Sequence, residues 1–76
     1  MTDQYQISNK IRELRFFADE MTQQQLATQV GVTRQTIMAI EKGKYSPSLE
    51  VAFKIAQAFD KPLDEVFTYQ SIDKQS

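Results

Sequence analysis

The sequence predicts a small all-α domain of five helices, with chain ends that carry the alternation of a short β-ribbon. Apolar residues recur every three or four positions through most of the chain. Ser, Thr, Gly and Pro stand where the helices would begin and end. The 76 residues are 41% hydrophobic with only two Gly and two Pro, which is the composition of a folded chain. Two cores would not fit this length, so we expect one domain over residues 1–76.

The first helix is expected over about residues 8–19. The apolar residues that share one face of it, at spacings of four, three and four, are Ile7, Ile11, Leu14 and Ala18. Phe17 is expected to widen this buried face. The first helix would therefore form one wall of the core.

Two shorter helices follow within about residues 22–43. Thr22 opens a Thr-x-x-Gln pattern, which is that of a capping box. Gly31, expected in a left-handed conformation, ends the second helix. Thr33 then caps a third helix that Gly43 ends. The inward-facing residues of the two helices are Leu26, Ala27, Val30, Val32, Ile37 and Ile40. Two short helices that meet across so tight a turn form a helix-turn-helix.

A loop and two more helices complete the predicted helical part. Residues 44–47 are expected to form the loop, and Ser48 caps a fourth helix over about residues 48–59. The residues of that helix expected to point inward are Leu49, Ala52, Ile55, Ala56 and Phe59. Pro62 suits the first turn of a fifth helix, over about residues 62–66, where acidic residues favour the helix dipole.

The two chain ends alternate polar with aromatic or branched residues, which is the period of a β-strand. The segments are residues 4–7 and 67–72. We expect them to pair as an antiparallel ribbon or to cross a dimer interface. The alternative for the C-terminal segment of residues 67–76 is a frayed tail.

Composition excludes several function classes. Without Cys or His there is no disulfide, no thiolate or imidazole metal site, and no Ser-His-Asp or Cys-His arrangement. The acidic pairs at residues 19–20 and 64–65 are expected to be solvated helix ends and not catalytic dyads. The sequence thus predicts no enzyme, catalytic residue, cofactor or metal. No apolar run exceeds four residues and no apolar signal opens the chain, so we expect a cytoplasmic protein without a membrane span.

The net charge is unevenly distributed along the chain. A formal charge of −1 and a pI near 5.2 argue against binding of polyanions over the whole surface. The net charge is −1 over residues 1–30, +2 over residues 31–49 and −2 over residues 50–76. A basic helix-turn-helix segment on an acidic scaffold would orient one face toward a nucleic acid.

The run QQQLATQVGVTRQTIMAIEK at residues 23–42, with GKYSPS after it, resembles the Cro/CI-type helix-turn-helix of the XRE family of bacterial and phage transcriptional regulators. The resemblance covers about residues 9–67. The run VTRQTI..IEKGKYSPSLE..FKIA is similar to a branch of small stand-alone dimeric repressors that includes the cytolysin repressor. The resemblance implies five helices, the third in the major groove of double-stranded DNA, and in some small members a terminal β-ribbon.

The resemblance also implies which residues contact bases. Arg34 and Gln35 open the third helix, where Arg can hold guanine O6 and N7 and Gln can hold adenine N6 and N7. The alternative is that both are merely solvated. Met38 and Ala39 lie beside them and would pack on thymine methyl groups, unless Met38 packs against the second helix instead.

Contacts with DNA phosphates are expected from residues around this helix. The candidates are Gln23, Thr33, Thr36, Lys42, Lys44 and Tyr45. For Lys42 and Lys44, attraction to the helix dipole is a compatible second role, and Thr33 is more certainly a cap. The family also pairs an Arg late in the first helix with a Glu late in the third, here Arg15 and Glu41, as a structural ion pair.

One recognition helix covers too few base pairs for specificity, so a homodimer on a palindromic operator is expected. The candidates for its interface are Phe53, Phe67 and Tyr69, while Leu63 and Val66 are expected in the monomer core. The leading function is a sequence-specific regulator, most simply a repressor. The alternative is an antitoxin or anti-regulator whose main partner is another protein and whose DNA binding is autoregulatory.

Overall fold

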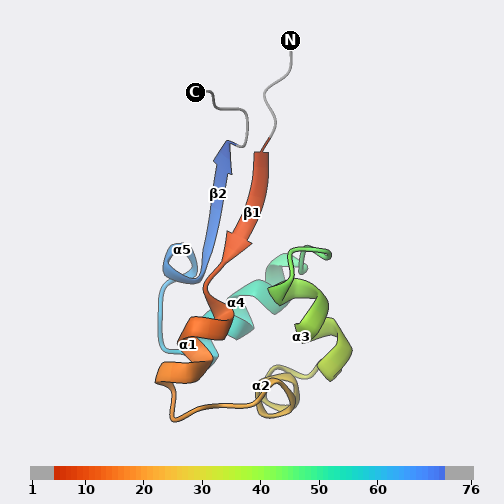
Figure 1. Ribbon diagram of the computed structural model, residues 1–76, viewed down its shortest axis with the longest axis vertical. Helices are drawn as coiled ribbons and strands as arrows, with labels where there is room; N and C mark the ends of the chain where they lie inside the picture. Colours follow the sequence, from red (N-terminus) through yellow and green to blue (C-terminus); the bar gives the residue numbers. More distant parts are fainter. Residues whose placement is uncertain (1–4, 72–76) are drawn as a thin grey trace.

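The computed structural model describes residues 5–71. Its elements, in chain order, are β1 (Tyr5–Asn9), α1 (Ile11–Phe17), α2 (Gln23–Val30), α3 (Arg34–Glu41), α4 (Leu49–Ala58), α5 (Leu63–Val66) and β2 (Phe67–Ser71). The helices surround one core, and the two strands stand away from this body as a ribbon (Figure 1). The predicted class, mostly helical with a small two-stranded antiparallel sheet, is confirmed for the described residues.

The ribbon joins the two ends of the same chain. β1 and β2 are antiparallel, with Ile7 opposite Tyr69 and Asn9 opposite Phe67. The backbone N–H of Lys10 donates to the carbonyl of Val66 at 3.0 Å, immediately below the last strand pair. The pairing therefore reaches the base of α1.

The first helix is shorter at both ends than the predicted span of residues 8–19. Residues 8 and 9 belong to β1, because their backbone is used by the ribbon, and the helix begins at Ile11. At the other end the helix stops at Phe17, since Asp19 and Glu20 adopt left-handed backbone angles with φ of 62° and 56°. The predicted helix start and end were both wrong here.

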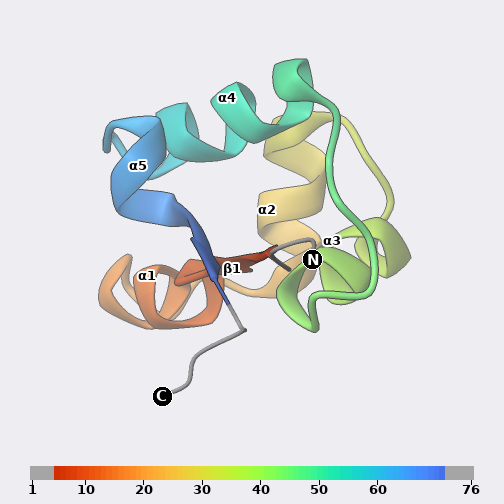
Figure 2. The same ribbon diagram turned by 90° about the horizontal axis from the view of Figure 1, so that it is seen from above.

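The core consists of apolar residues from every helix. Its buried members are Ile11, Leu26, Ala27, Val30, Ile37, Ile40, Ile55, Ala56 and Val66. Each fully buried Ile or Leu contributes about 1.5–3 kcal/mol relative to an exposed one. Leu63 and Phe67 pack against this cluster from the side, half-buried. The core thus fixes α2 and α3 against α1 and α4, an arrangement visible from above in Figure 2.

Three residues predicted for the core are exposed. Ile7 is 42% exposed, because it lies on β1 and not on the buried face of α1. Phe17 is 75% exposed, because six residues after Ile11 the helix has turned about 240°, far from the buried face. Leu49 is 67% exposed because it stands at the first position of α4, and the buried side of this helix begins three residues later, at Ala52. Phe59 is half-buried and not fully inside.

Candidate nucleic-acid interface

Local hydrogen bonds fix the start of α2 and the turn between α2 and α3. The Thr22 hydroxyl accepts from the Gln25 N–H at 3.0 Å, and the Gln25 side chain accepts from the Thr22 N–H at 2.8 Å, which completes the capping box. Gly31 ends α2 with a φ of 89°, which glycine adopts without steric cost. The Thr33 hydroxyl then accepts from the Thr36 N–H at 3.1 Å and begins α3. These predicted caps are confirmed.

The first turn of α3 presents polar side chains to solvent. Ile37 and Ile40 are buried on its inner side, so the two residues that open the helix, Arg34 and Gln35, are exposed. Met38 and Ala39, one turn later, are half-buried. The structure therefore leaves the side chains of Arg34 and Gln35 accessible to solvent, and gives Met38 and Ala39 a smaller accessible surface.

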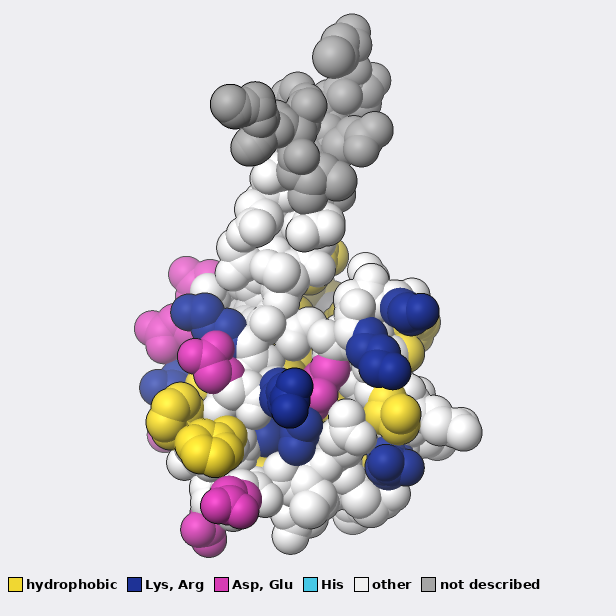
Figure 3. All heavy atoms as spheres, in the orientation of Figure 1, with side chains coloured by type: hydrophobic (Ala, Val, Ile, Leu, Met, Phe, Trp, Pro, Cys, Tyr) yellow, Lys and Arg dark blue, Asp and Glu magenta, His cyan; other side chains and the backbone are white. Residues whose placement is uncertain are grey.

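Positive charge gathers on the same side. Lys42 caps the end of α3, and Lys44 and Tyr45 follow in the loop, all three exposed. Figure 3 shows Lys and Arg side chains over α3 and this loop, whereas acidic and basic side chains are mixed over α1 and α5. A face of this sign attracts the phosphates of a nucleic acid.

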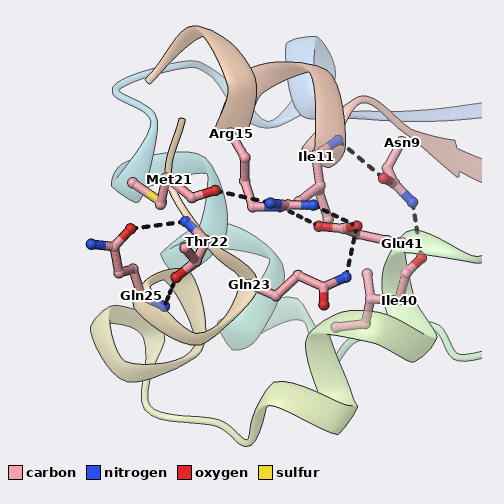
Figure 4. Close-up of polar contacts among 9 residues, drawn as sticks. All are labelled: Asn9, Ile11, Arg15, Met21, Thr22, Gln23, Gln25, Ile40 and Glu41. Carbon is pink, nitrogen blue, oxygen red and sulfur yellow. Dashed lines mark hydrogen bonds and ion pairs between the residues drawn. The ribbon is translucent and has the colours of Figure 1, made fainter. Parts of the chain in front are cut away.

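A partly buried carboxylate, that of Glu41, ties α1, α2 and α3 together (Figure 4). The Arg15 Nε donates to Glu41 Oε2 at 2.6 Å and its Nη2 donates to Oε1 at 3.2 Å, while Nη1 donates to the Met21 carbonyl at 2.9 Å. The side chains of Arg15 and Glu41 are only 15% and 9% exposed. The structure thus brings together the two residues expected to form the interhelical ion pair.

The same carboxylate also holds Gln23, at the first position of α2. The Gln23 Nε2 donates to Glu41 Oε1 at 3.2 Å, a contact that the sequence did not suggest. One N–H of this amide is therefore engaged within the protein, and the amide has a second N–H that this bond does not use. Among the other phosphate candidates, the Thr33 and Thr36 hydroxyls lie 2.9 Å apart and bond to each other.

Asn9 has a structural role between two elements, although the sequence predicted it at the start of the first helix. Its Oδ1 accepts from the Ile11 N–H at 3.1 Å, and its Nδ2 donates to the Ile40 carbonyl at 2.9 Å. One side chain therefore starts α1 and also joins the base of the ribbon to the C-terminal end of α3. The only signal in the sequence was an Asn in the first turn of the predicted helix, where its side chain can bond to nearby backbone groups.

The candidate dimer residues differ in accessibility. Phe53 and Tyr69 are 52% and 70% exposed, whereas Phe67 is half-buried against the core. An open apolar groove lies next to them between α4, α5 and the ribbon. It is lined by Ile7, Pro47, Leu49, Ala52, Leu63 and Phe67. Val66 is fully buried and Leu63 half-buried, as the sequence analysis expected for core residues.

Two other kinds of site were sought in the described residues. None of the helices between residues 5 and 71 is long and apolar enough to cross a membrane. Over the same residues, no group of three or more acidic, His or Cys side chains is placed to hold a metal ion.

Comparison with known proteins identifies two relatives of similar length and a third that is longer. An uncharacterised HTH-type transcriptional regulator of Methanocaldococcus jannaschii is 48% identical over 64 residues, 84% of this chain and 96% of that protein. One of Bacillus subtilis is 49% identical over 61 residues, 80% of this chain and 91% of that protein. The transcriptional repressor RstR of the cryptic phage CTXphi of Vibrio cholerae is 41% identical over 59 residues, 78% of this chain and 52% of that repressor.

Structural comparison agrees with the sequence relatives. The crystal structure of a protein from Bacteroides fragilis superposes with a TM-score of 0.70, covering 82% of this chain and 98% of that one. At 24% identity this likeness concerns the fold alone. The helix-turn-helix family profile matches residues 11–66, which include all five helices described. The chain therefore belongs to the helix-turn-helix family, in its XRE-type, Cro/CI-like branch, and is a transcriptional regulator with a DNA-binding domain.

Proposed function

We propose that this protein is a sequence-specific repressor that binds a palindromic operator as a homodimer, with α3 in the major groove. The observation that carries the proposal is the exposed first turn of α3, where Arg34 and Gln35 project from a basic face. Residues at the start of a recognition helix reach base edges, and these two side chains match guanine and adenine respectively. The likeness to RstR, which is named a transcriptional repressor, favours repression.

The remaining candidates have supporting roles in this proposal. Met38 and Ala39 would contact thymine methyl groups beside the two readers. Phosphate contacts would come from the residues that surround them, which are Gln23, Thr33, Thr36, Lys42, Lys44 and Tyr45. The hydrogen bond from Gln23 to Glu41 holds one of these side chains in place before DNA arrives, which lowers the entropy cost of contact.

A homodimer would supply the second half-site. Phe53 and Tyr69 are exposed apolar side chains near the groove between α4 and the ribbon, and Phe67 lines that groove. Burying them against a second copy would place two α3 helices on half-sites about 34 Å apart. Repression would then follow from occupancy of the operator.

Selection from a random pool of duplex DNA tests the proposal directly. We expect a palindromic sequence that binds at least about a thousandfold more tightly than bulk DNA, with an affinity that falls steeply as salt rises. If the best selected duplex binds no better than bulk DNA, sequence-specific repression is wrong.

Two substitutions distinguish recognition of the bases from electrostatic attraction to the phosphates. Arg34→Ala should relax the base preference at one position of each half-site by about tenfold to a hundredfold. Lys44→Ala should weaken binding to all duplexes alike and reduce the salt dependence by about one phosphate contact. Both are measured by titration of the selected operator and of its single-base variants. An equal loss on every sequence for Arg34→Ala would make it a phosphate contact.

A further inference from the structure

The ribbon leaves the helical body at one narrow point. β1 continues into α1 through Lys10, β2 leaves α5 at Val66, and the Lys10 N–H donates to the Val66 carbonyl at 3.0 Å. Phe67, the first residue of β2, packs against the core at the same place. Beyond this point the ribbon stands away from the helices (Figure 1). A single narrow connection does not by itself fix the direction of the ribbon relative to the helices.

An open groove separates the ribbon from the C-terminal end of α3. Residues 6–9 of β1 and Tyr69 of β2 line it on the side of the ribbon. Residues 41–43, where α3 ends, and Ser46 of the following loop line the other side. Because the groove is open, the ribbon and α3 are not in continuous contact along their lengths.

The side chain of Asn9 connects the ribbon to α3 where β1 ends. Its Nδ2 donates to the carbonyl of Ile40, in the last turn of α3, at 2.9 Å, and its Oδ1 accepts from the Ile11 N–H at 3.1 Å (Figure 4). Asn9 is half-buried and Ile40 is 1% exposed, so the bond between them is partly shielded from water. The Asn9 amide is therefore a second attachment of the ribbon, displaced from the first toward α3.

The direction of the ribbon matters because the proposed homodimer uses it. Two of the three candidate dimer residues, Phe67 and Tyr69, lie on β2, whereas the candidate base readers Arg34 and Gln35 open α3. In a palindrome, each added base pair moves the second half-site by about 3.4 Å along the duplex and about 35° around it. A dimer whose α3 helices are fixed relative to the ribbon therefore accepts one half-site spacing.

We propose that Asn9 is a positioning residue for DNA recognition. Its bond to Ile40 holds α3 at a fixed angle to the ribbon and so sets the half-site spacing that the dimer accepts. Asn9 itself makes no contact with DNA in this proposal, which rests on the homodimer and the palindromic operator proposed above.

Asn9→Ser distinguishes the two hydrogen bonds of this side chain. The Ser hydroxyl can still accept from the Ile11 N–H, but it has no amide that reaches the Ile40 carbonyl. Asn9→Asp, which also keeps the acceptor and loses the donor, is a second variant of the same size. Gln6→Ser is the matched control, because Gln6 is exposed and lines the same groove on β1. It removes a side-chain amide from the same strand and leaves the bond to Ile40 in place.

The first measurement is the dependence of affinity on operator spacing. The selected operator is compared with duplexes in which one base pair is inserted or removed between the half-sites. The unsubstituted protein and Gln6→Ser should lose at least about tenfold in affinity on the altered spacings. Asn9→Ser should bind the operator more weakly, because a less ordered ribbon must be fixed on binding, but should lose less than about threefold on the altered spacings.

The second measurement uses the protein without DNA. Residual dipolar couplings from NMR report the directions of backbone N–H bonds in a common frame. In the unsubstituted protein and in Gln6→Ser, the couplings of the ribbon and of α3 should fit one alignment tensor. In Asn9→Ser and Asn9→Asp, the couplings of the ribbon should no longer fit the tensor of α3.

Two results would overturn the positioning role. One is an Asn9→Ser protein that keeps the full spacing penalty on the selected operator. The other is a ribbon whose couplings still fit the tensor of α3 in both Asn9 variants. Selection of no operator would instead overturn the proposed function, and the couplings would still decide whether Asn9 holds the ribbon, so the two failures are distinguishable.

Discussion

At the scale of single residues, the Glu41 carboxylate has the largest structural consequence. It is 9% exposed and accepts from Arg15 twice and from Gln23 once, so its charge is compensated by donors from two other elements. Removing a carboxylate from water costs several kcal/mol, and the hydrogen bonds and charge of these donors must offset that cost. Loss of either charged partner leaves the other buried and unpaired.

Glu41→Ala should lower the free energy of unfolding by about 3–5 kcal/mol, because the Arg15 guanidinium is then stranded. Arg15→Met combined with Glu41→Leu should recover much of that loss, since it removes both charges and refills the space. Urea unfolding measures both variants. Glu50→Ala is the control: its ion pair with Lys54 is exposed and worth at most about 1 kcal/mol. A double variant no more stable than Glu41→Ala would contradict this account.

At the scale of the elements, the helices are defined by their ends. Thr22, Thr33 and Ser48 each cap a helix with a hydroxyl that accepts a backbone N–H three residues later. Helices of eight to ten residues are too short to be stable alone. The caps therefore fix where each helix starts, and packing against the core stabilises it.

Thr22→Ala should destabilise the protein by about 1 kcal/mol, because it leaves the Gln25 N–H without its acceptor and breaks the capping box. The midpoint of thermal unfolding measures the loss. Thr28→Ala, in the exposed middle of α2, is the matched control: it removes only an exposed bond from Gln24 and raises helix propensity, so it should not lower stability. Equal effects of the two substitutions would show that the cap adds nothing.

At the scale of the whole molecule, different faces have different chemistry. Basic side chains surround α3, acidic and basic ones are mixed over α1 and α5, and an apolar groove runs between α4 and the ribbon. The near-zero net charge is therefore a sum over a basic face and faces of mixed sign. Such a surface favours approach to DNA with α3 leading and keeps non-specific binding weak.

Phe53→Ser should weaken the proposed homodimer by at least about tenfold without unfolding the monomer, because this half-exposed ring contributes little to the core. Sedimentation equilibrium measures the dissociation constant, and operator binding should shift to higher protein concentration in parallel. Phe16→Ser is the matched control and should leave the dimer intact. An unchanged dissociation constant for Phe53→Ser would move the interface elsewhere.

The sequence by itself determined the helix-turn-helix, because its signals act over three or four residues: the Thr22 and Thr33 caps, the left-handed Gly31 and the apolar spacing of α2 and α3. An antiparallel ribbon was one of the arrangements predicted for the chain ends, and it is the one that residues 5–9 and 67–71 adopt. Only the tertiary structure decided the limits of α1, whereas the outward direction of Phe17 follows from the helical period itself.

The candidate DNA-binding site likewise has features that the sequence determines and features that only the tertiary structure decides. The exposure of Arg34 and Gln35 follows from their places on a helix whose buried face is evident in the sequence. The contacts of Asn9 with Ile40, and of Gln23 with Glu41, span 31 and 18 residues. Local propensity carries no information about which distant groups will meet. The geometry of these polar contacts is decided only when α1, α2 and α3 pack on one core and each buried donor must find an acceptor.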